Sequence, residues 1–207
     1  ALAAVLSQPE GGLKGIPQGA RRIVLLNQVE GERLAGAARS LARRLLGPYE
    51  AVVAASLQSE AGVQAVYERT AGVLLAAGGA ERLGSPKQLL DWNGQPFVVA
   101  AAKTGLAAGL DPLVVVTGAY ADEVEATLAG LDVQIVRNAD WQQGQASSVK
   151  AGLAALPAEV GAAIFMVVDQ PQLPAALLEA LQAQHARTLA PIVATQVDGN
   201  RSESESE

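Results

Sequence analysis

Apolar runs alternate with segments of helical periodicity along most of this sequence. An apolar run bounded by turn residues predicts a buried strand, and apolar residues three or four apart predict a helix. After residue 70 the predicted strands are 73–77, 113–117, 133–136, 162–168 and 192–195, and the predicted helices are 95–109, 122–128, 144–156 and 175–184. This alternation predicts a doubly wound α/β fold with a mostly parallel, Rossmann-like sheet.

A shorter α/β pattern precedes it. Its predicted strands are 23–26 and 51–55, and its predicted helices are 31–46 and 60–69. We therefore expect a small partial α/β segment at 1–69, a main domain at 70–201 and a disordered acidic tail at 202–207. No flexible linker marks the boundary, so the first two parts are expected to pack closely.

Composition and charge narrow the classes of function. Of the 207 residues 50% are hydrophobic but only 3% are aromatic, so the core must consist of Ala, Val and Leu. The net charge of −6 argues against binding nucleic acid or an anionic membrane through charge alone. With no cysteine, the chain has no disulfide and no thiolate metal site. No apolar run reaches membrane-spanning length and no signal-peptide pattern is present, so the cytoplasm is the expected location.

The stretch 73–90 carries the strongest chemical signal. Its apolar start is followed by Gly78 and Gly79, which allow a sharp turn and a close approach of the backbone to a ligand. Arg82 and Lys87 are the only cations in the stretch. A glycine-rich loop after a strand, with one Arg and one Lys, suits a polyphosphate. The spacing differs from that of the P-loop, and an ordinary strand-to-turn junction is the alternative.

Residues 75–90, Leu-Ala-Ala-Gly-Gly-Ala-Glu-Arg-Leu-Gly-Ser-Pro-Lys-Gln-Leu-Leu, resemble the signature loop of nucleotidyltransferases. Within that group they look most like the molybdenum cofactor cytidylyltransferases of the MobA-like family. The segments 141–152 and 167–171 are similar to two further family motifs and occur in the family order. The resemblance implies an enzyme that transfers CMP from CTP to molybdopterin and releases pyrophosphate, with Mg²⁺ as cofactor. The family's guanylyltransferases tend to have Leu-Ala-Gly-Gly at residues 75–78, so Leu-Ala-Ala-Gly favours CTP over GTP.

The resemblance also assigns roles to single residues. Lys87 and Arg82 hold the triphosphate and Asp169 holds Mg²⁺, and these three are the expected catalytic residues. The expected nucleotide-binding residues are Leu75, Ala76, Ala77, Gly78, Gly79, Arg82, Lys87, Asn138 and Ser147. For Lys87 the plain alternative is a solvated surface lysine.

Other candidate residues have structural alternatives that the sequence leaves open. Asp169 and Ser147 are also placed to cap helices, and Asn138 is a common turn residue. Trp141 either stacks on a pterin or belongs to the core. His185, the only histidine, is expected at the surface or in packing.

The segment at 1–69 carries a second resemblance. Asn27-Gln-Val-Glu30 is imperfectly similar to the Asn-Lys-x-Asp motif of P-loop GTPases, with Gln28 in place of Lys and Glu30 in place of Asp. With Lys14-Gly-Ile-Pro17, it resembles the C-terminal part of a GTPase-like accessory protein for selenium-dependent molybdenum hydroxylases. That resemblance makes a molybdenum hydroxylase the expected protein partner. A polar turn after a strand is the alternative.

The C-terminal end departs from the family pattern. Val197-Asp-Gly-Asn-Arg201 is similar to the approach to a family segment that does not follow, and the chain ends as Ser-Glu-Ser-Glu-Ser-Glu. The expected domain is therefore incomplete, and Mg²⁺ has one protein carboxylate. Two other functions stay open: nucleotidyl transfer to another acceptor such as a sugar phosphate, and a non-catalytic role in maturing a molybdenum hydroxylase.

Overall fold

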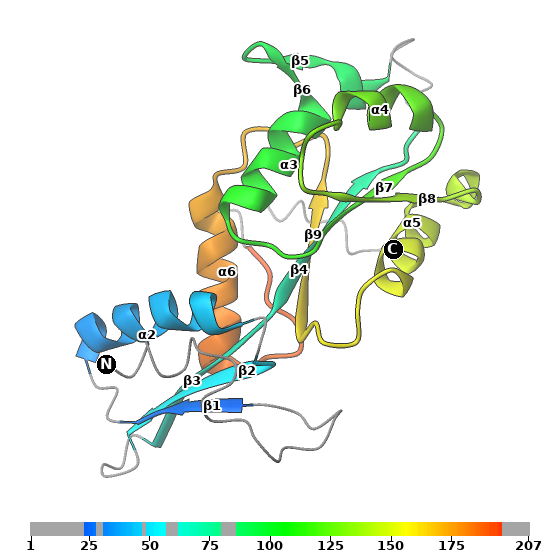
Figure 1. Ribbon diagram of the computed structural model, residues 1–207. Helices are drawn as coiled ribbons and strands as arrows, with labels where there is room; N and C mark the ends of the chain where they lie inside the picture. The colour runs from blue at the N-terminus through cyan, green and yellow to red at the C-terminus, as the bar shows by residue number, and fades with distance from the viewer. Residues whose placement is uncertain (1–22, 28–30, 47–48, 57–61, 80–85, 196–207) are drawn as a thin grey trace, which may run out of the picture.

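The described part of the chain forms a small N-terminal sheet, a larger parallel sheet and a two-stranded antiparallel sheet at 91–96 (Figure 1). The computed structural model describes residues 23–27, 31–46, 49–56, 62–79 and 86–195. The strands are β1 (Ile23–Leu26), β2 (Ala51–Ser56), β3 (Gly62–Glu68), β4 (Thr70–Ala76), β5 (Asp91–Trp92), β6 (Gln95–Pro96), β7 (Leu113–Thr117), β8 (Gln134–Arg137) and β9 (Ala162–Val167). The helices are α2 (Gly31–Leu45), α3 (Phe97–Ala107), α4 (Ala121–Thr127), α5 (Gln145–Ala154) and α6 (Ala175–Thr188), with 3-10 turns η1 (Lys87–Leu89) and η2 (Trp141–Gln143).

The larger sheet has four parallel strands in the order β8-β7-β4-β9. Helices α3, α4 and α6 cover one face and α5 covers the other. The central strands β4 and β7 are buried almost throughout, which explains why their sequences are continuous apolar runs. The predicted doubly wound α/β fold is confirmed. All four strands end at the same edge of the sheet, where open α/β folds bind ligands.

Close packing of α5 on the sheet depends on Gly152. A Cβ atom at Gly152 would collide with Cγ1 of Val73 in β4, a core residue with no exposed surface. The missing side chain therefore sets how near α5 lies to β4, and with it the position of the N-terminal end of α5.

We predict opposite effects for two helical Gly-to-Ala substitutions. Gly152→Ala overpacks a full core and should lower the free energy of unfolding by about 1–3 kcal/mol. Gly36→Ala, in α2, has no atom within 4 Å of the new Cβ and should raise it by up to about 1 kcal/mol through helix propensity. Urea denaturation of both variants measures the two changes. A stabilised Gly152→Ala variant would contradict the packing described above.

The N-terminal sheet has the order β1-β2-β3. Strand β1 pairs in parallel with β2, and α2 connects them across one face. The core between α2 and the sheet consists of small and branched residues, namely Val24, Leu26, Ala38, Ala42, Leu45, Val52, Ala54 and Ala65. The strands expected at 23–26 and 51–55 and the helix expected at 31–46 are therefore present.

The prediction of a helix at 60–69 is wrong. Residues 62–68 form β3, which pairs antiparallel with β2, and residues 57–61 lie outside the described residues. Ala65 and Tyr67, two positions apart, both pack in the core under α2. That spacing is the period of a strand. The segment forms a strand because β2 supplies it with backbone hydrogen bonds. The local propensity of a short segment does not reveal such a partner.

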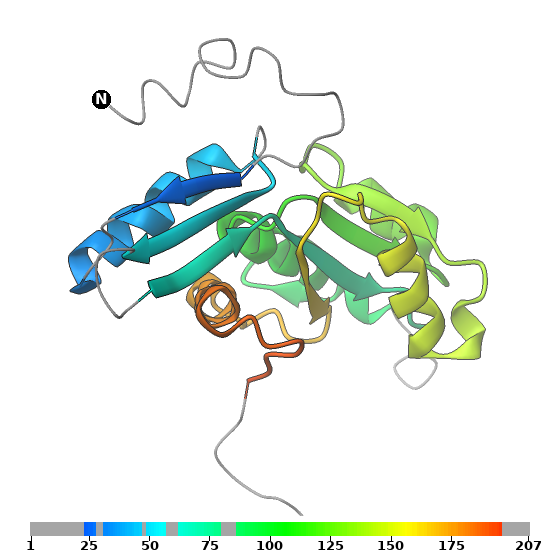
Figure 2. The same ribbon diagram turned by 90° about the horizontal axis from the view of Figure 1, so that it is seen from below.

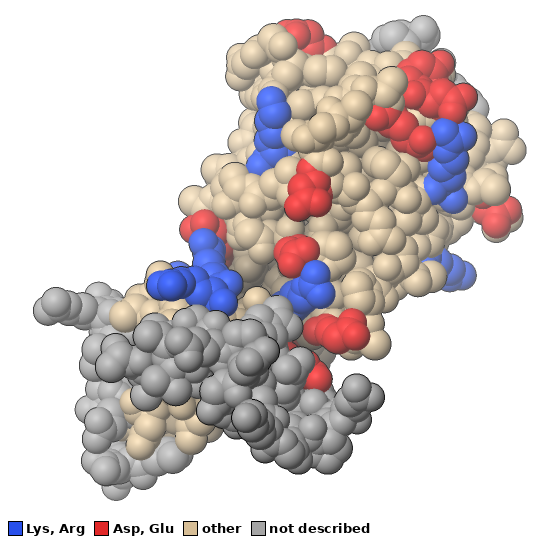
Figure 3. Space-filling view, viewed as in Figure 1, with Lys and Arg blue, Asp and Glu red and all other residues tan. Residues whose placement is uncertain are grey.

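The two sheets are joined by very little chain. Only Arg69 separates β3 from β4, and Figure 2 shows the chain passing from one sheet into the other. Helix α6 packs in both cores, since Leu178 belongs to the larger core and Ala186 to the N-terminal one. Arg43 of α2 also forms an ion pair with Glu179 of α6 at 3.2 Å. Figure 3 shows basic and acidic groups interspersed over the described part of one face. The division into domains at residue 69 stays a prediction.

The strand expected at 192–195 is also absent. These residues are irregular, and Ile192 is 84% exposed. An apolar run becomes a strand only when a neighbour satisfies its backbone hydrogen bonds, and no such pairing involves this segment in the described part of the chain. No described helix is long and apolar enough to cross a membrane. Residues 196–207, including the expected tail, lie outside the described residues.

Candidate functional site

A cavity of about 590 Å³ opens at the carboxyl ends of β4 and β9. Four parts of the chain form its wall: the end of β4 with the glycines after it, the turn η1, the stretch from η2 into α5, and the end of β9. The lining residues are Leu75, Ala77, Gly78, Gly79, Lys87, Gln88, Trp141, Gln142, Gly144, Gln145, Ser148, Val167, Val168 and Asp169.

The loop after β4 is held from one side by Gln88. Its Nε2 atom donates to the carbonyl oxygen of Ala76 at 2.9 Å and to that of Gly78 at 2.7 Å. Gln88 is 2% exposed, and its buried Oε1 atom has no hydrogen-bond partner among the described residues. A single buried amide thus connects two alternate carbonyls of the loop.

The same loop is held from the strand beside it. The backbone N–H of Ala119 donates to the carbonyl of Ala77 at 3.2 Å, and the Tyr120 hydroxyl donates to the carbonyl of Gly79 at 3.1 Å. Together with Gln88, these donors engage four successive carbonyl oxygens at residues 76–79. The first turn of the loop is therefore anchored at every residue.

Trp141 forms one wall of the cavity because two glycines leave room for it. A Cβ atom at Gly79 would lie 2.8 Å from Cζ3 of Trp141, and one at Gly118 would lie 2.9 Å from Cβ of Trp141 and 2.6 Å from the carbonyl oxygen of Ala77. The ring is half-buried and packs beside the core of β4 and β7. Trp141 therefore serves the core and the cavity together, so the two expectations for it are compatible.

Lys87 and Asp169 both line the cavity and are exposed. Lys87 begins η1, and Asp169 follows the last residues of the β9 run. The alternative of a capping Asp169 is wrong, because α6 begins at Ala175 with Pro174 at its N-cap. Arg82, the third expected catalytic residue, lies outside the described residues.

Asn138 and Ser147 interact with each other. The Asn138 side-chain amide donates to the Ser147 hydroxyl at 2.8 Å and to the Ser148 hydroxyl at 3.0 Å, while its Oδ1 accepts the N–H of Asp140 at 3.0 Å. Ser148 lines the cavity, whereas Asn138 and Ser147 are not among its lining residues. Ser147 does not cap α5, whose N-cap is Gly144. Their binding of nucleotide stays a prediction.

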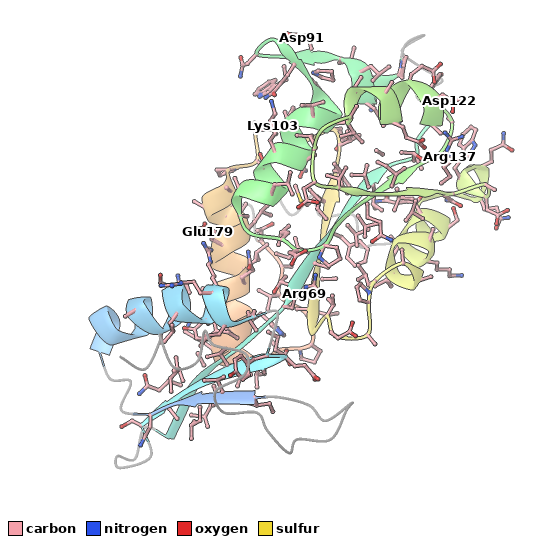
Figure 4. All side chains as sticks on the ribbon, in the orientation of Figure 1. Arg69, Asp91, Lys103, Asp122, Arg137 and Glu179 are labelled. Carbon is pink, nitrogen blue, oxygen red and sulfur yellow. The ribbon has the colours of Figure 1, made fainter. Side chains whose placement is uncertain are left out.

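Arg137 ends β8 near the cavity but is engaged elsewhere. Its guanidinium donates to Glu125 at 2.7 and 2.8 Å and to Asp122 at 2.7 Å, both on α4 (Figure 4). The hydrogen bonds from Arg137 hold the pKa of Glu125 below its usual range. This cation therefore ties β8 to α4 and is committed to carboxylates.

His185 lies on α6, away from this cavity. Its Nε2 atom is buried, 3.9 Å from a carboxylate oxygen of Glu68, and its Nδ1 atom lies 3.3 Å from the carbonyl oxygen of Ala190. The side chain packs where α6 meets β3, which agrees with the expected role in packing.

Sequence reasoning assigned no role to Gln88 or Tyr120. A signal for Gln88 existed: it is the only polar uncharged residue in Lys-Gln-Leu-Leu, at the start of an apolar segment. A buried polar side chain in such a place needs backbone partners. Tyr120 carried no comparable signal, because its contact with Gly79 spans 41 positions of sequence.

A doubly wound sheet with a glycine-rich loop, a lysine and a carboxylate around one cavity at its carboxyl edge is an arrangement in which open α/β proteins bind nucleotides. The family model for the MobA-like NTP transferase domain matches residues 72–204. The chain belongs to the MobA-like NTP transferase family.

Three similar proteins give the extent of the likeness. Nicotine blue oxidoreductase from Paenarthrobacter nicotinovorans is 41% identical over 115 residues, which are 55% of this chain and 56% of the relative. The bifunctional enzyme IspD/IspF of Novosphingobium aromaticivorans is 33% identical over 55% of this chain and 30% of the relative. A solved nucleotidyl transferase from Methanothermobacter is 33% identical, with a TM-score of 0.51, over 56% of this chain and 57% of that one. The chain thus spans about half or less of the length of these relatives.

The cavity contains donors that fit a substrate-bound divalent cation. No group of three or more His, Cys, Asp or Glu side chains that could hold a metal ion occurs among the described residues. Asp169 supplies one exposed carboxylate at the cavity. Magnesium is commonly held by one or two carboxylates together with phosphate oxygens of the substrate. The donor set therefore fits Mg²⁺ that arrives with a nucleotide.

Proposed function

We propose that this chain transfers CMP from CTP to the phosphate of molybdopterin and releases pyrophosphate. The observation that carries the proposal is the single cavity shared by Gly78, Gly79, Lys87 and Asp169. The glycines and Lys87 suit a polyphosphate by their chemistry, and the family resemblance assigns Mg²⁺ to Asp169. Membership of the MobA-like NTP transferase family supports nucleotidyl transfer as the type of reaction.

The chemistry follows from the charges that change during transfer. A phosphate oxygen of the acceptor forms a bond to the α-phosphorus, and the bond from that phosphorus to the bridging oxygen breaks, so pyrophosphate leaves with its electrons. Negative charge grows on the α-phosphate and on the leaving group. Lys87, with the loop N–H group at Gly79, is placed to stabilise that charge.

Asp169 would hold Mg²⁺ in the same cavity. When bound, Mg²⁺ supplies neutralisation of phosphate charge and orients the oxygens that it contacts. Asp169 is exposed and caps no helix, so its carboxylate is available for this role. Arg82 is proposed to hold the triphosphate beside Lys87, on the sequence resemblance alone.

We expect the protein to bind CTP with Mg²⁺ more tightly than GTP or ATP. The supporting feature is Leu75-Ala76-Ala77-Gly78 at the end of β4, proposed to frame a pyrimidine. Isothermal titration calorimetry with the three nucleotides, with and without Mg²⁺, measures the preference. Equal binding of all three would overturn the choice of CTP, and no binding of any would overturn the nucleotide assignment.

A second candidate is favoured by a relative's name. The protein that is 41% identical over 115 residues is called an oxidoreductase. In that case the same cavity would bind the substrate of an oxidation or reduction. Turnover of a redox dye, without pyrophosphate release from CTP, would support this candidate over nucleotidyl transfer.

Two further alternative functions can be distinguished, one by its reaction product and the other by its binding partner. Pyrophosphate release with a sugar phosphate in place of molybdopterin would identify another acceptor. Copurification with a molybdenum hydroxylase, without any nucleotide-dependent pyrophosphate release, would support a non-catalytic maturation role. The basis for that partner, at 14–17 and 28–30, lies outside the described residues.

A further inference from the structure

We propose that Gln88 is the positioning residue of the nucleotide-binding loop: its buried amide sets the direction of the loop N–H groups that receive phosphate. The inference deepens the proposed function and rests on it. Gln88 lines the cavity, but its nitrogen is turned towards the carbonyls of Ala76 and Gly78. It therefore acts through the loop and not by direct contact with a phosphate.

The orientation of this amide is fixed by chemistry. The atom nearest to Ala76 and Gly78 has two carbonyl oxygens within 3 Å. Carbonyl oxygens only accept, so the atom between them must be Nε2, which has two hydrogens to donate. Turning the amide over would put Oε1 against both oxygens. The side chain thus has one acceptable orientation, in which Nε2 makes both contacts.

Holding a carbonyl also directs the next N–H group. In a trans peptide the C=O and the following N–H point in opposite directions within one plane. Binding of the Ala76 and Gly78 carbonyls to Gln88 therefore turns the N–H groups of Ala77 and Gly79 away from it. Ala119 and Tyr120 bind the carbonyls of Ala77 and Gly79 and so hold the same stretch of backbone in place. Such a loop needs no reorganisation when an anion binds.

The closing experiment replaces Gln88 with Met and with Glu. Gln88→Met keeps the length of the side chain and removes both hydrogen bonds. It should still fold, because it also removes the buried Oε1, which has no partner in the described part of the chain. We expect CTP affinity to fall about tenfold, since each lost N–H–phosphate contact involves a charged acceptor. Amide hydrogen exchange at Ala77 and Gly79 should quicken in the nucleotide-free protein.

Gln88→Glu adds a signature that a purely structural residue would not show. The new carboxylate faces two carbonyls in a buried place, so its pKa rises and the charged form is disfavoured. Above that pKa it repels both carbonyls, and below it one O–H can bind one carbonyl. Relative to the wild type at each pH, CTP affinity should therefore be lost at about pH 8 and partly recover towards about pH 6.

Gln142→Glu is the matched control. Gln142 also lines the cavity but is exposed, and the same charge change there leaves the loop carbonyls untouched. An exposed glutamate titrates near pH 4.3, so any loss of affinity in this variant should not recover between about pH 8 and about pH 6.

The possible outcomes separate the two proposals. If the wild type binds no nucleotide, the proposed function fails and the positioning role fails with it. If the wild type binds CTP and Gln88→Met binds it equally well with unchanged hydrogen exchange, only the positioning role is overturned. Should Gln88→Glu fail to fold, Gln88→Met decides alone, by affinity and exchange. A similar recovery of CTP affinity at low pH in Gln88→Glu and Gln142→Glu would also overturn the positioning role.

Discussion

Lys87→Ala should lower the turnover of nucleotidyl transfer by about two orders of magnitude or more, the loss seen when one preorganised donor to a transition state is removed. Lys87 lines the cavity at the start of η1, beside the loop glycines. Its positive charge matters most when negative charge develops on the α-phosphate and the leaving pyrophosphate. Ground-state affinity for CTP should therefore change less than turnover. Steady-state release of pyrophosphate and calorimetric binding of CTP measure the two quantities separately.

Lys103→Ala is the control for this experiment. Lys103 is also exposed, but it lies on α3, donates to Gln95 at 2.8 Å and does not line the cavity. It loses the same charge, so it should retain turnover. Equal losses in the two variants would mean that net charge matters and the position of Lys87 does not. Unchanged turnover in Lys87→Ala would remove the catalytic role.

Asp169→Asn should abolish most of the Mg²⁺ dependence of CTP binding and leave folding intact. The substitution keeps the shape of the side chain and removes only its charge, which is the property that a hard cation requires of its ligand. The structure excludes an N-cap role, because the N-cap of α6 is Pro174. The substitution therefore removes no helix cap, and the melting temperature should stay near that of the wild type.

Asp140→Asn serves as the comparison for that variant. Asp140 follows β8 at the same edge of the sheet but does not line the cavity. Mg²⁺-dependent binding of CTP should survive in it. If Asp169→Asn binds CTP with undiminished Mg²⁺ dependence, the metal role of Asp169 is lost. If Mg²⁺-dependent CTP binding weakens equally in both variants, the cause is the general negative charge at this edge of the sheet and not coordination of the metal by Asp169.

Most of the larger sheet was predictable from sequence, and the reason is burial. Strands β4 and β7 are covered on both faces, so their sequences are apolar throughout and their limits follow from the turn residues around them. Strand β3 was missed because its residues are mostly half-buried, so its alternation is weak. The run at 192–195 was mistaken for a strand because composition does not say whether a ladder partner exists.

The candidate site also has features that the sequence predicts and features that depend on the fold. Gly78, Gly79, Lys87 and Asp169 could be chosen from sequence because each has a chemical property that stands out locally. Asn138 could also be chosen, but its side chain is satisfied by Ser147 and Ser148. Whether a polar group is free for a ligand depends on which neighbours the fold brings within hydrogen-bonding distance.

The sequence by itself determined the alternation of strands and helices in the larger domain, the family resemblance and the loop that carries glycines and cations. These properties are local, since each depends on residues a few positions apart. Only the tertiary structure decided that β3 is a strand, that α6 packs in two cores and that Gln88 holds the loop carbonyls. Those outcomes depend on hydrogen bonds and contacts between distant segments, and their free energy exists only once the chain has brought the partners together.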